Sequence, residues 1–166
     1  MKVKKHEGHE REIPHAHIYH TILPLIFFLI WILDSNFFRI SIFLNNYIPF
    51  LVRLSICIIV FIIALTFINL SHRALFKSHQ PANSLITHGI LRYVRNPMYL
   101  GILLIYIACI FLSISLISIA FFVLVFFVYN WMVNFEEKIL ADLFNNQWFE
   151  YKKNVPKWFP NPFKKY

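Results

Sequence analysis

The sequence predicts an all-α membrane protein, a polytopic transmembrane helical bundle of about four spans whose last two form a tight hairpin, with a C-terminal interfacial helix and tail. The chain is 58% hydrophobic and only 14% charged over 166 residues, more apolar than a soluble domain of this length could bury. The apolar residues form long uncharged runs flanked by basic residues. Without a repeat or flexible linker to divide it, the chain should be a polar, histidine-containing tail (residues 1–17) and one membrane domain (residues 18–166).

The first two apolar runs predict the first two spans. Residues 18–33 are just long enough to cross a bilayer and are followed by Asp34-Ser35-Asn36, which we interpret as a helix stop. The next helix should begin near Pro49, because proline suits the first helical turn, and it continues without a charge over residues 54–70.

The longest uncharged stretch, residues 98–135, predicts two further spans. As one straight helix it would extend about 57 Å at about 1.5 Å per residue, whereas the apolar core of a bilayer is about 30 Å thick. The stretch must therefore fold back on itself. The small polar residues Ser113, Ser115 and Ser118 mark the expected turn.

The distribution of basic residues predicts the orientation. With four spans, the N-terminal tail, the 71–97 connection and the C-terminal tail share one face, and they hold 14 of the 16 Lys and Arg residues. Because such residues accumulate on the cytoplasmic side, both termini should be cytoplasmic. Attraction to anionic lipid headgroups explains the net charge of +8 more simply than nucleic-acid binding does.

The residues after the last span predict a helix on the membrane surface. Over residues 136–153, Leu140, Phe144 and Trp148 recur every fourth position, with charges elsewhere. Residues 155–160, Val-Pro-Lys-Trp-Phe-Pro, should end this helix, because prolines cannot continue it. We expect this tail to fold back over the 71–97 connection.

Arginines and glutamates supply the candidate chemistry. Arg92 and Arg95 precede a helix that should begin at Pro97, where guanidinium groups and the helix dipole favour a bound anion; the bland alternative is the positive-inside bias alone. Glu136 and Glu137 directly follow an apolar helix. They could accept hydrogen bonds from an ammonium group or ribose hydroxyls, or simply be a solvated helix end.

Histidines and cysteines are less informative. The N-terminal group could bind a metal, but its irregular spacing favours a solvated tail; it comprises His6, His9, His15, His17 and His20. His72, His79 and His88 should be surface residues. Cys57 and Cys109 lie in apolar stretches and suit packing better than a disulfide or a metal site.

Two sequence blocks together resemble the isoprenylcysteine carboxyl methyltransferase and phospholipid methyltransferase superfamily. The first is residues 85–101, Leu-Ile-Thr-His-Gly-Ile-Leu-Arg-Tyr-Val-Arg-Asn-Pro-Met-Tyr-Leu-Gly. The second starts at Glu136-Glu137 and ends with residues 155–160. Both blocks occur in order, separated by a helical hairpin, and they span roughly residues 75–160. The chain departs from the pattern at Ile90, Leu91 and Asn145, which replace the usual proline, aromatic residue and glycine.

The resemblance implies a membrane enzyme that holds S-adenosyl-L-methionine near the cytoplasmic face and takes a lipophilic substrate from the bilayer. Arg95, Glu136 and Glu137 would be the catalytic residues. Carried over position by position, the cofactor site would comprise Gly89, Arg92, Tyr93, Arg95, Asn96, Pro97, Tyr99, Gly101, Glu136, Glu137, Pro156 and Trp158.

Methyl transfer requires donor and acceptor to be aligned away from water, without a nucleophilic side chain or a metal. A carboxylate acceptor needs no base, whereas an amine must lose a proton, for which the sequence offers Glu136 or Glu137. We expect Arg95 and one of these acids to hold the charged methionine end of the cofactor. The alternatives are a non-catalytic scaffold or transporter subunit with the same fold, and an NADPH-dependent membrane reductase.

Overall fold

The computed structural model describes residues 16–76 and 84–160, so His6, His9, His15, His79 and most of the N-terminal tail lie outside the described residues. The described residues form helices and turns. In chain order these are α1 (Ala16–Ile32), a π-helical segment η2 (Leu33–Phe38), a 3-10 turn η3 (Phe43–Asn46), α2 (Phe50–Phe76), a 3-10 turn η4 (Gly89–Arg92), α3 (Pro97–Ser113), α4 (Leu116–Phe144) and α5 (Asn146–Asn154).

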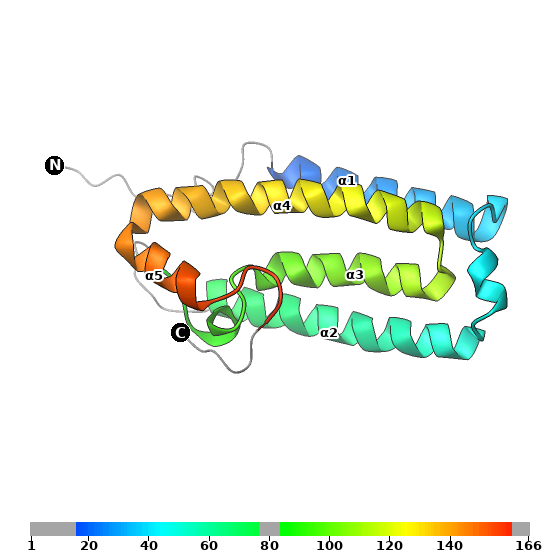
Figure 1. The fold of residues 1–166 in the computed structure, drawn as a ribbon, viewed down its shortest axis with the longest axis horizontal. Coiled ribbons are helices and arrows are strands. Elements are labelled where there is room, and N and C mark those ends of the chain that lie inside the picture. The colour runs from blue at the N-terminus through cyan, green and yellow to red at the C-terminus, as the bar shows by residue number, and fades with distance from the viewer. Residues whose placement is uncertain (1–15, 77–83, 161–166) are drawn as a thin grey trace.

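The four long helices run back and forth along one axis, and the short α5 lies at the end where α4 finishes (Figure 1). Three segments, Ala16–Phe38, Phe50–Leu75 and Leu116–Phe144, are long and apolar enough to cross a membrane. Helix α3 is apolar but has only 17 residues, about 26 Å at about 1.5 Å per residue. The predicted all-α membrane fold is confirmed, while the count of four spans stays a prediction.

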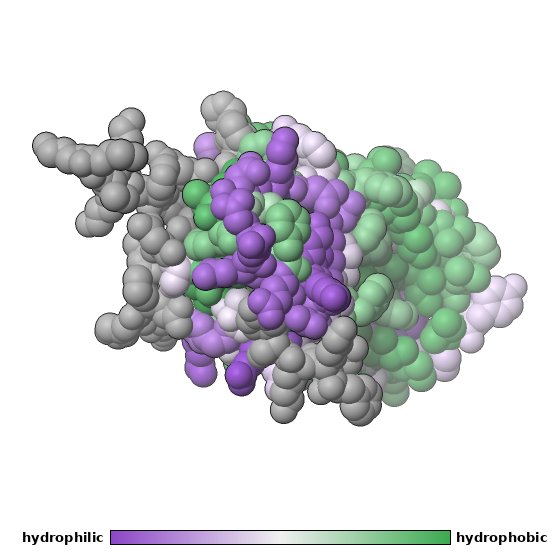
Figure 2. Space-filling view, turned by 60° about the vertical axis from the view of Figure 1, so that its left-hand side comes forward, coloured by the Kyte–Doolittle hydropathy of each residue, from purple (hydrophilic) through white to green (hydrophobic). Residues whose placement is uncertain are grey.

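The surface of the bundle shows how it sits in lipid. Hydrophilic residues gather at the end that carries α5, whereas the body of the bundle is mostly hydrophobic (Figure 2). Helix α2 leaves large apolar side chains such as Ile58, Ile59 and Ile62 exposed. Because water does not favour so much exposed apolar surface, the protein is an integral membrane protein.

The predicted serine turn joins α3 to α4. Ile114 ends α3 in the left-handed conformation with φ 43°, and the Ser115 side chain accepts a hydrogen bond from the Ser118 N–H at 3.0 Å. The hairpin is tight only at this turn, however. Helix α3 packs chiefly against α2 and α4 against α1, because a layer of large side chains, among them Phe27, Tyr106 and Tyr129, lies in the core that α1, α3 and α4 share.

The α-helix ends at Ile32, just before the predicted stop at Asp34-Ser35-Asn36, but these residues continue as a π-helical segment to Phe38, and the chain turns only at Arg39, with φ 52°. Asp34 is buried where the connection between α1 and α2 meets the α3–α4 turn. Its Oδ1 accepts hydrogen bonds from the N–H groups of Ile40 and Ser41, both at 3.1 Å, and its Oδ2 accepts one from Ser115 Oγ at 2.5 Å. The Ser41 hydroxyl also donates to Oδ2.

The predicted surface helix over residues 136–153 is two helices. Helix α4 continues unbroken past Glu136 and Glu137 to Phe144, and the chain turns at Asn145, with φ 44° and ψ −119°, before α5. Tryptophan and tyrosine side chains of α5, Trp148 and Tyr151, are buried together with Val155 in a small second core. This core also includes Leu85, as expected for a tail that folds over the 71–97 connection.

Candidate active site

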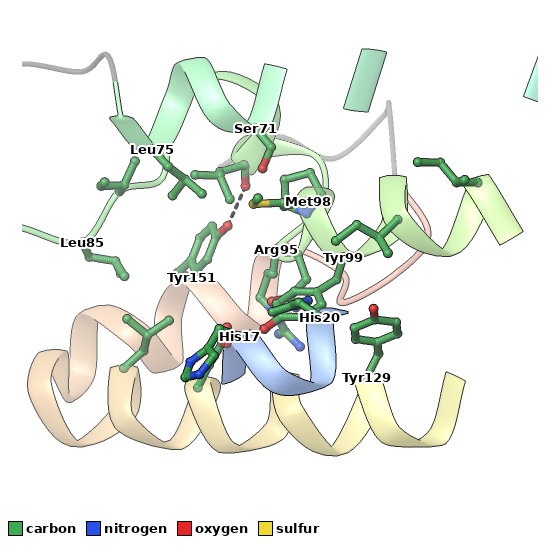
Figure 3. A pocket seen from close by; sticks show the side chains of 18 of the residues that line it. His17, His20, Ser71, Leu75, Leu85, Arg95, Met98, Tyr99, Tyr129 and Tyr151 are labelled. Atoms are coloured by element: carbon green, nitrogen blue, oxygen red, sulfur yellow. Dashed lines mark hydrogen bonds between the residues drawn. The ribbon is translucent and has the colours of Figure 1, made fainter. Parts of the chain in front are cut away.

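A cavity of about 790 Å³ opens at the polar end of the bundle, a volume typical of small-molecule sites. It is bounded by the start of α1, the end of α2, the start of α3, the second half of α4 and α5 (Figure 3). Apolar and aromatic side chains make most of its wall. The polar and titratable side chains of the wall are His17, His20, Thr21, Ser71, Ser84, Arg95, Asn96, Tyr99, Tyr106, Tyr129, Glu136, Trp148 and Tyr151.

Glu137 is the centre of a buried ion-pair network behind this wall. Arg95 Nε donates to Glu137 Oε1 at 3.1 Å, and Asn96 Nδ2 donates to the same oxygen at 3.1 Å. Lys152 Nζ of α5 lies 3.6 Å from Glu137 Oε2. The side chains of Arg95 and Glu137 are only 8% and 6% exposed. This network joins α3, α4 and α5 at one point.

Arg95 has further bonds that fix its position. Its Nη1 donates to the Lys152 carbonyl at 2.9 Å, and its backbone N–H donates to the Pro156 carbonyl at 2.9 Å. Its guanidinium also lies 5.8 Å from the centre of the Trp148 ring, a cation–π distance. Arg95 Nη2 also lies 3.5 Å from Glu137 Oε2, so three of the five N–H groups of the guanidinium donate to these residues and two remain for other acceptors.

Glu136 differs from its neighbour because it lines the cavity. The Tyr99 hydroxyl, on α3, donates a hydrogen bond to Glu136 Oε1. Of these two adjacent residues of α4, Glu137 therefore belongs to the ion-pair network and Glu136 lines the cavity. The sequence pair Glu136-Glu137 thus divides into two environments.

Two regions of the cavity have different chemistry. Around Ser71, Leu75, Leu85 and Tyr151 the wall is built by α2, the connection and α5, whereas His20, Tyr99 and Tyr129 form a separate aromatic region (Figure 3). Two buried wall atoms, Ser71 Oγ and Trp148 Nε1, have no hydrogen-bond partner among the described residues. Because such atoms are costly to leave unpaired, they fit a ligand with polar groups in the α2–α5 region.

The C-terminal tail is held on α4 beside the cavity. Lys157 Nζ donates to Asn130 Oδ1 at 2.6 Å and to Asn134 Oδ1 at 2.8 Å, and Trp158 Nε1 donates to Asn130 Oδ1 at 3.3 Å. Partial burial lowers the pKa of Lys157, while the Glu137 carboxylate acts in the opposite direction. The tail therefore packs on α4 beside the site and outside the cavity.

Five of the residues predicted for the cofactor site line the cavity, namely Arg95, Asn96, Pro97, Tyr99 and Glu136. The others lie outside its lining: Gly89, Arg92, Tyr93, Gly101, Glu137, Pro156 and Trp158.

The two glycines predicted for the cofactor site, Gly89 and Gly101, lie where the backbone conformation or the helix packing favours glycine. Gly89 has φ 65°, which favours glycine at the start of η4. A Cβ on Gly101 would lie 2.6 Å from Ile68 Cγ1 and 2.9 Å from the Ala64 carbonyl oxygen, so glycine permits the close approach of α2 and α3.

The α1 histidines are the main residues that sequence reasoning missed. His17 and His20 were expected to belong to a solvated tail, but both lie on α1 and line the cavity. The helix begins at Ala16, and this brings His20 against Tyr99 of α3 and Tyr129 of α4. The apolar run starting at Ile18 was a signal that these residues could be helical, but only the packing of α1 places them at the site.

The family model for phospholipid methyltransferases matches residues 47–147 of this chain. This match covers more than half of the sequence and includes the Arg95, Asn96, Tyr99 and Glu136-Glu137 positions. The chain belongs to the phospholipid methyltransferase family. The family predicted from the two sequence blocks is thereby confirmed, although α1 and the tail after residue 147 lie outside the matched region.

The fold is also similar to a solved structure, that of the eukaryotic intramembrane Ras methyltransferase, isoprenylcysteine carboxyl methyltransferase. The TM-score is 0.57 with 22% sequence identity over 91% of this chain and 54% of that one. The chain thus spans about half the length of this structural relative. At this identity the similarity shows the fold alone. No curated protein sequence matches the chain significantly.

Proposed function

We propose that this member of the phospholipid methyltransferase family is an enzyme that transfers a methyl group from S-adenosyl-L-methionine to a lipid acceptor at the membrane surface. The observation that carries the proposal is the cavity itself, in which Arg95, Asn96, Tyr99 and Glu136 from both matched blocks line one wall. The family name points to a phospholipid acceptor, and the structural relative named above acts on an isoprenylcysteine carboxyl group.

The α2–α5 region of the cavity fits the donor molecule. Its adenosine part is aromatic and polar, which suits the Trp148 and Tyr151 rings and the unpaired Ser71 Oγ and Trp148 Nε1 atoms. The methionine part carries a carboxylate, to which Arg95 can donate, and an ammonium group, for which Glu136 is the acid among the described lining residues. When bound, this cofactor supplies an electrophilic methyl group on a positively charged sulfur.

Glu137 then has a positioning role. It holds Arg95 and Asn96 against the start of α3, so that both side chains face the cavity with few alternative conformations. Such pre-organisation is the main contribution that a protein makes to a displacement reaction, which needs alignment more than acid or base chemistry.

The acceptor would lie along the apolar wall made by Pro24 and Phe28 of α1 and Ile102 and Ile105 of α3. These residues are well inside the apolar helices, so a lipid tail could remain in a bilayer-like environment while its headgroup reaches Tyr99 and Glu136. The apolar wall also excludes water from the reacting atoms. From the distribution of basic residues, this end of the bundle should face the cytoplasm.

The test is methyl transfer by the full-length protein in lipid nanodiscs with methyl-labelled S-adenosyl-L-methionine and total membrane lipid. We expect a labelled lipid, and we expect Glu136→Gln to reduce its formation by about 100-fold, because the carboxylate lines the site. Glu150→Gln on the exposed surface of α5 is the matched control and should behave as wild type.

Other outcomes identify the alternatives. Cofactor binding by calorimetry without any labelled product would indicate a non-catalytic member of the family. Binding of NADPH in place of S-adenosyl-L-methionine would indicate a reductase and would overturn the proposal.

A further inference from the structure

His20 lies in the region of the cavity where the acceptor headgroup would be, although it belongs to neither sequence block and lies outside the residues matched to the family. Its ring centre is 5.6 Å from that of Tyr99 and 5.7 Å from that of Tyr129, and the two tyrosine rings are 5.8 Å apart. Three helices thus hold three rings together, with His20 next to Tyr99 in Figure 3.

The neighbours of this cluster determine its chemistry. Tyr99 donates its hydroxyl hydrogen to Glu136, and Tyr129 lies 3.4 Å, oxygen to oxygen, from Tyr106 deeper in the cavity. A carboxylate is therefore hydrogen-bonded to one member of the ring cluster. The titratable and charged groups that face this part of the cavity are His17 on α1, Arg95 before α3, Tyr99 and Tyr106 on α3, and Tyr129 and Glu136 on α4.

An amine acceptor poses a problem that the two sequence blocks do not solve. At neutral pH an alkylamine is protonated, since its proton leaves in water only near pH 10, and a protonated amine has no lone pair for methyl transfer. Glu137 is fully engaged with Arg95, Asn96 and Lys152 outside the cavity lining. A carboxylate is in general a weak base, because carboxyl groups lose their proton at about pH 4, whereas an imidazole changes charge between about pH 5 and 8, close to the operating range.

We propose that His20 is a catalytic residue of this enzyme, the base that takes the proton from the ammonium group of a lipid acceptor. This inference rests on the proposed function. Neutral His20 accepts the N–H proton and becomes an imidazolium, and the lone pair released on nitrogen forms the new N–C bond with the donor methyl group. The C–S bond breaks and its electron pair stays on sulfur, which becomes neutral.

Glu136 assists this step through charge. It favours the incoming ammonium and afterwards the His20 imidazolium, so the positive charge stays balanced while it moves from acceptor to histidine. The imidazolium returns its proton to water at the polar end of the cavity, where the exposed His17 marks the rim.

The first experiment is the pH profile of methyl transfer by the full-length protein in nanodiscs. His20→Phe keeps a ring in the cluster but cannot accept a proton, so we expect turnover at pH 7 to fall by about 100-fold. The deficit should shrink by about tenfold per pH unit between pH 7 and 9, as unbound amine loses its own proton and no longer needs a base.

His72→Phe is the matched control. His72 is an exposed histidine close to the C-terminal end of α2, the end that borders the cavity, but it lies outside the cavity lining. It should retain wild-type turnover at every pH. A His20→Phe deficit that is the same at all pH values would mean that His20 only packs, and turnover equal to wild type would mean that it has no role; either result overturns the proposal. Failure of wild type to label any lipid would instead overturn the proposed function.

The second experiment follows the NMR signal of the His20 ring in the absence of methyl transfer. In protein with ¹⁵N-labelled histidine, the His20 ring signal is identified by its loss in His20→Phe. Addition of a primary alkylammonium amphiphile should shift this signal, because its N–H group donates to the ring. The trimethylammonium counterpart has no N–H group, so it should leave the signal close to its free position. Equal shifts with both amphiphiles, or none with either, would overturn the proposal.

Discussion

The two ends of the bundle each contain a buried carboxylate, but the two carboxylates have different partners. Asp34, 3% exposed, accepts hydrogen bonds from two backbone N–H groups and from the hydroxyls of Ser41 and Ser115. Glu137, 5% exposed, is bound by Arg95, Asn96 and Lys152. The donors to the first carboxylate are short and neutral, whereas two of the three side chains that bind the second are long and cationic.

The cavity described above lies at the end that contains Glu137. The short donors around Asp34 draw the first connection onto the α3–α4 turn, where Ile117 N–H also donates to Ser41 Oγ at 3.0 Å. At the other end, the long side chains of Arg95 and Lys152 connect the start of α3 and α5 to Glu137 of α4, and the cavity lies beside this network. One end is a structural joint, and the other is a joint beside a site.

The largest effect should follow from Glu137→Ala, which leaves the Arg95 guanidinium buried without its carboxylate. Breaking a buried pair in this way costs about 3–5 kcal/mol, so the unfolding midpoint in detergent should fall steeply. The neighbouring exposed Lys138→Ala is the control. Replacing Glu137 and Arg95 together by methionine should restore much of the stability without restoring cofactor affinity. A Glu137→Ala protein as stable as wild type would mean that the network does not hold this end together.

Asp34→Ala should come next, at about 3 kcal/mol, because two backbone N–H groups and two serine hydroxyls lose a charged acceptor. Asp34→Asn keeps one acceptor oxygen and should lose about half as much. In both variants the folded fraction should bind S-adenosyl-L-methionine as wild type does, since the joint is remote from the cavity. A weakened cofactor affinity would show instead that the two ends are coupled.

Gly101→Ala tests the close contact of α2 and α3 near the site. The added Cβ meets Ile68 Cγ1 at 2.6 Å and the Ala64 carbonyl oxygen at 2.9 Å, so we expect a loss of about 2 kcal/mol, a usual cost of overpacking. Ile68→Ala in the same chain should recover only part of this loss, because the backbone oxygen of Ala64 cannot withdraw as a side chain can. Complete recovery in thermal unfolding would show that the Ala64 contact is unimportant.

The smallest effect should be a gain from Asn145→Gly. Asn145 adopts φ 44° and ψ −119°, a conformation that glycine adopts freely and other residues rarely do. Relief of this strain between α4 and α5 should raise the free energy of unfolding by about 1 kcal/mol. Asn154→Gly, at the end of α5, should have no such benefit. A melting temperature lowered by Asn145→Gly would mean that the Asn145 side chain has a role of its own.

Much of the architecture was predictable because a bilayer imposes a length and a polarity on each span. The apolar runs, the serine turn before α4 and the tail over the 71–97 connection all follow from these constraints. The proximity of Arg95 to the two acids of α4 was predictable from the two blocks, but the Arg95–Glu137 ion pair and the choice of which acid lines the cavity were not. Adjacent residues on a helix point about 100° apart, so only the position of α3 determines which of them faces the cavity.

By itself, the sequence determined that this is a helical membrane protein of the methyltransferase type, because hydrophobic length and local motifs depend on residues close together in the chain. Only the tertiary structure decided that Asp34 joins Ser41 and Ser115 and that His20 of α1 stands in the cavity with Tyr99 and Tyr129. Apart from Asp34 and Ser41, which are seven positions apart, those contacts link residues about 80 or more positions apart. They depend on how whole helices pack, and no local pattern specifies that packing.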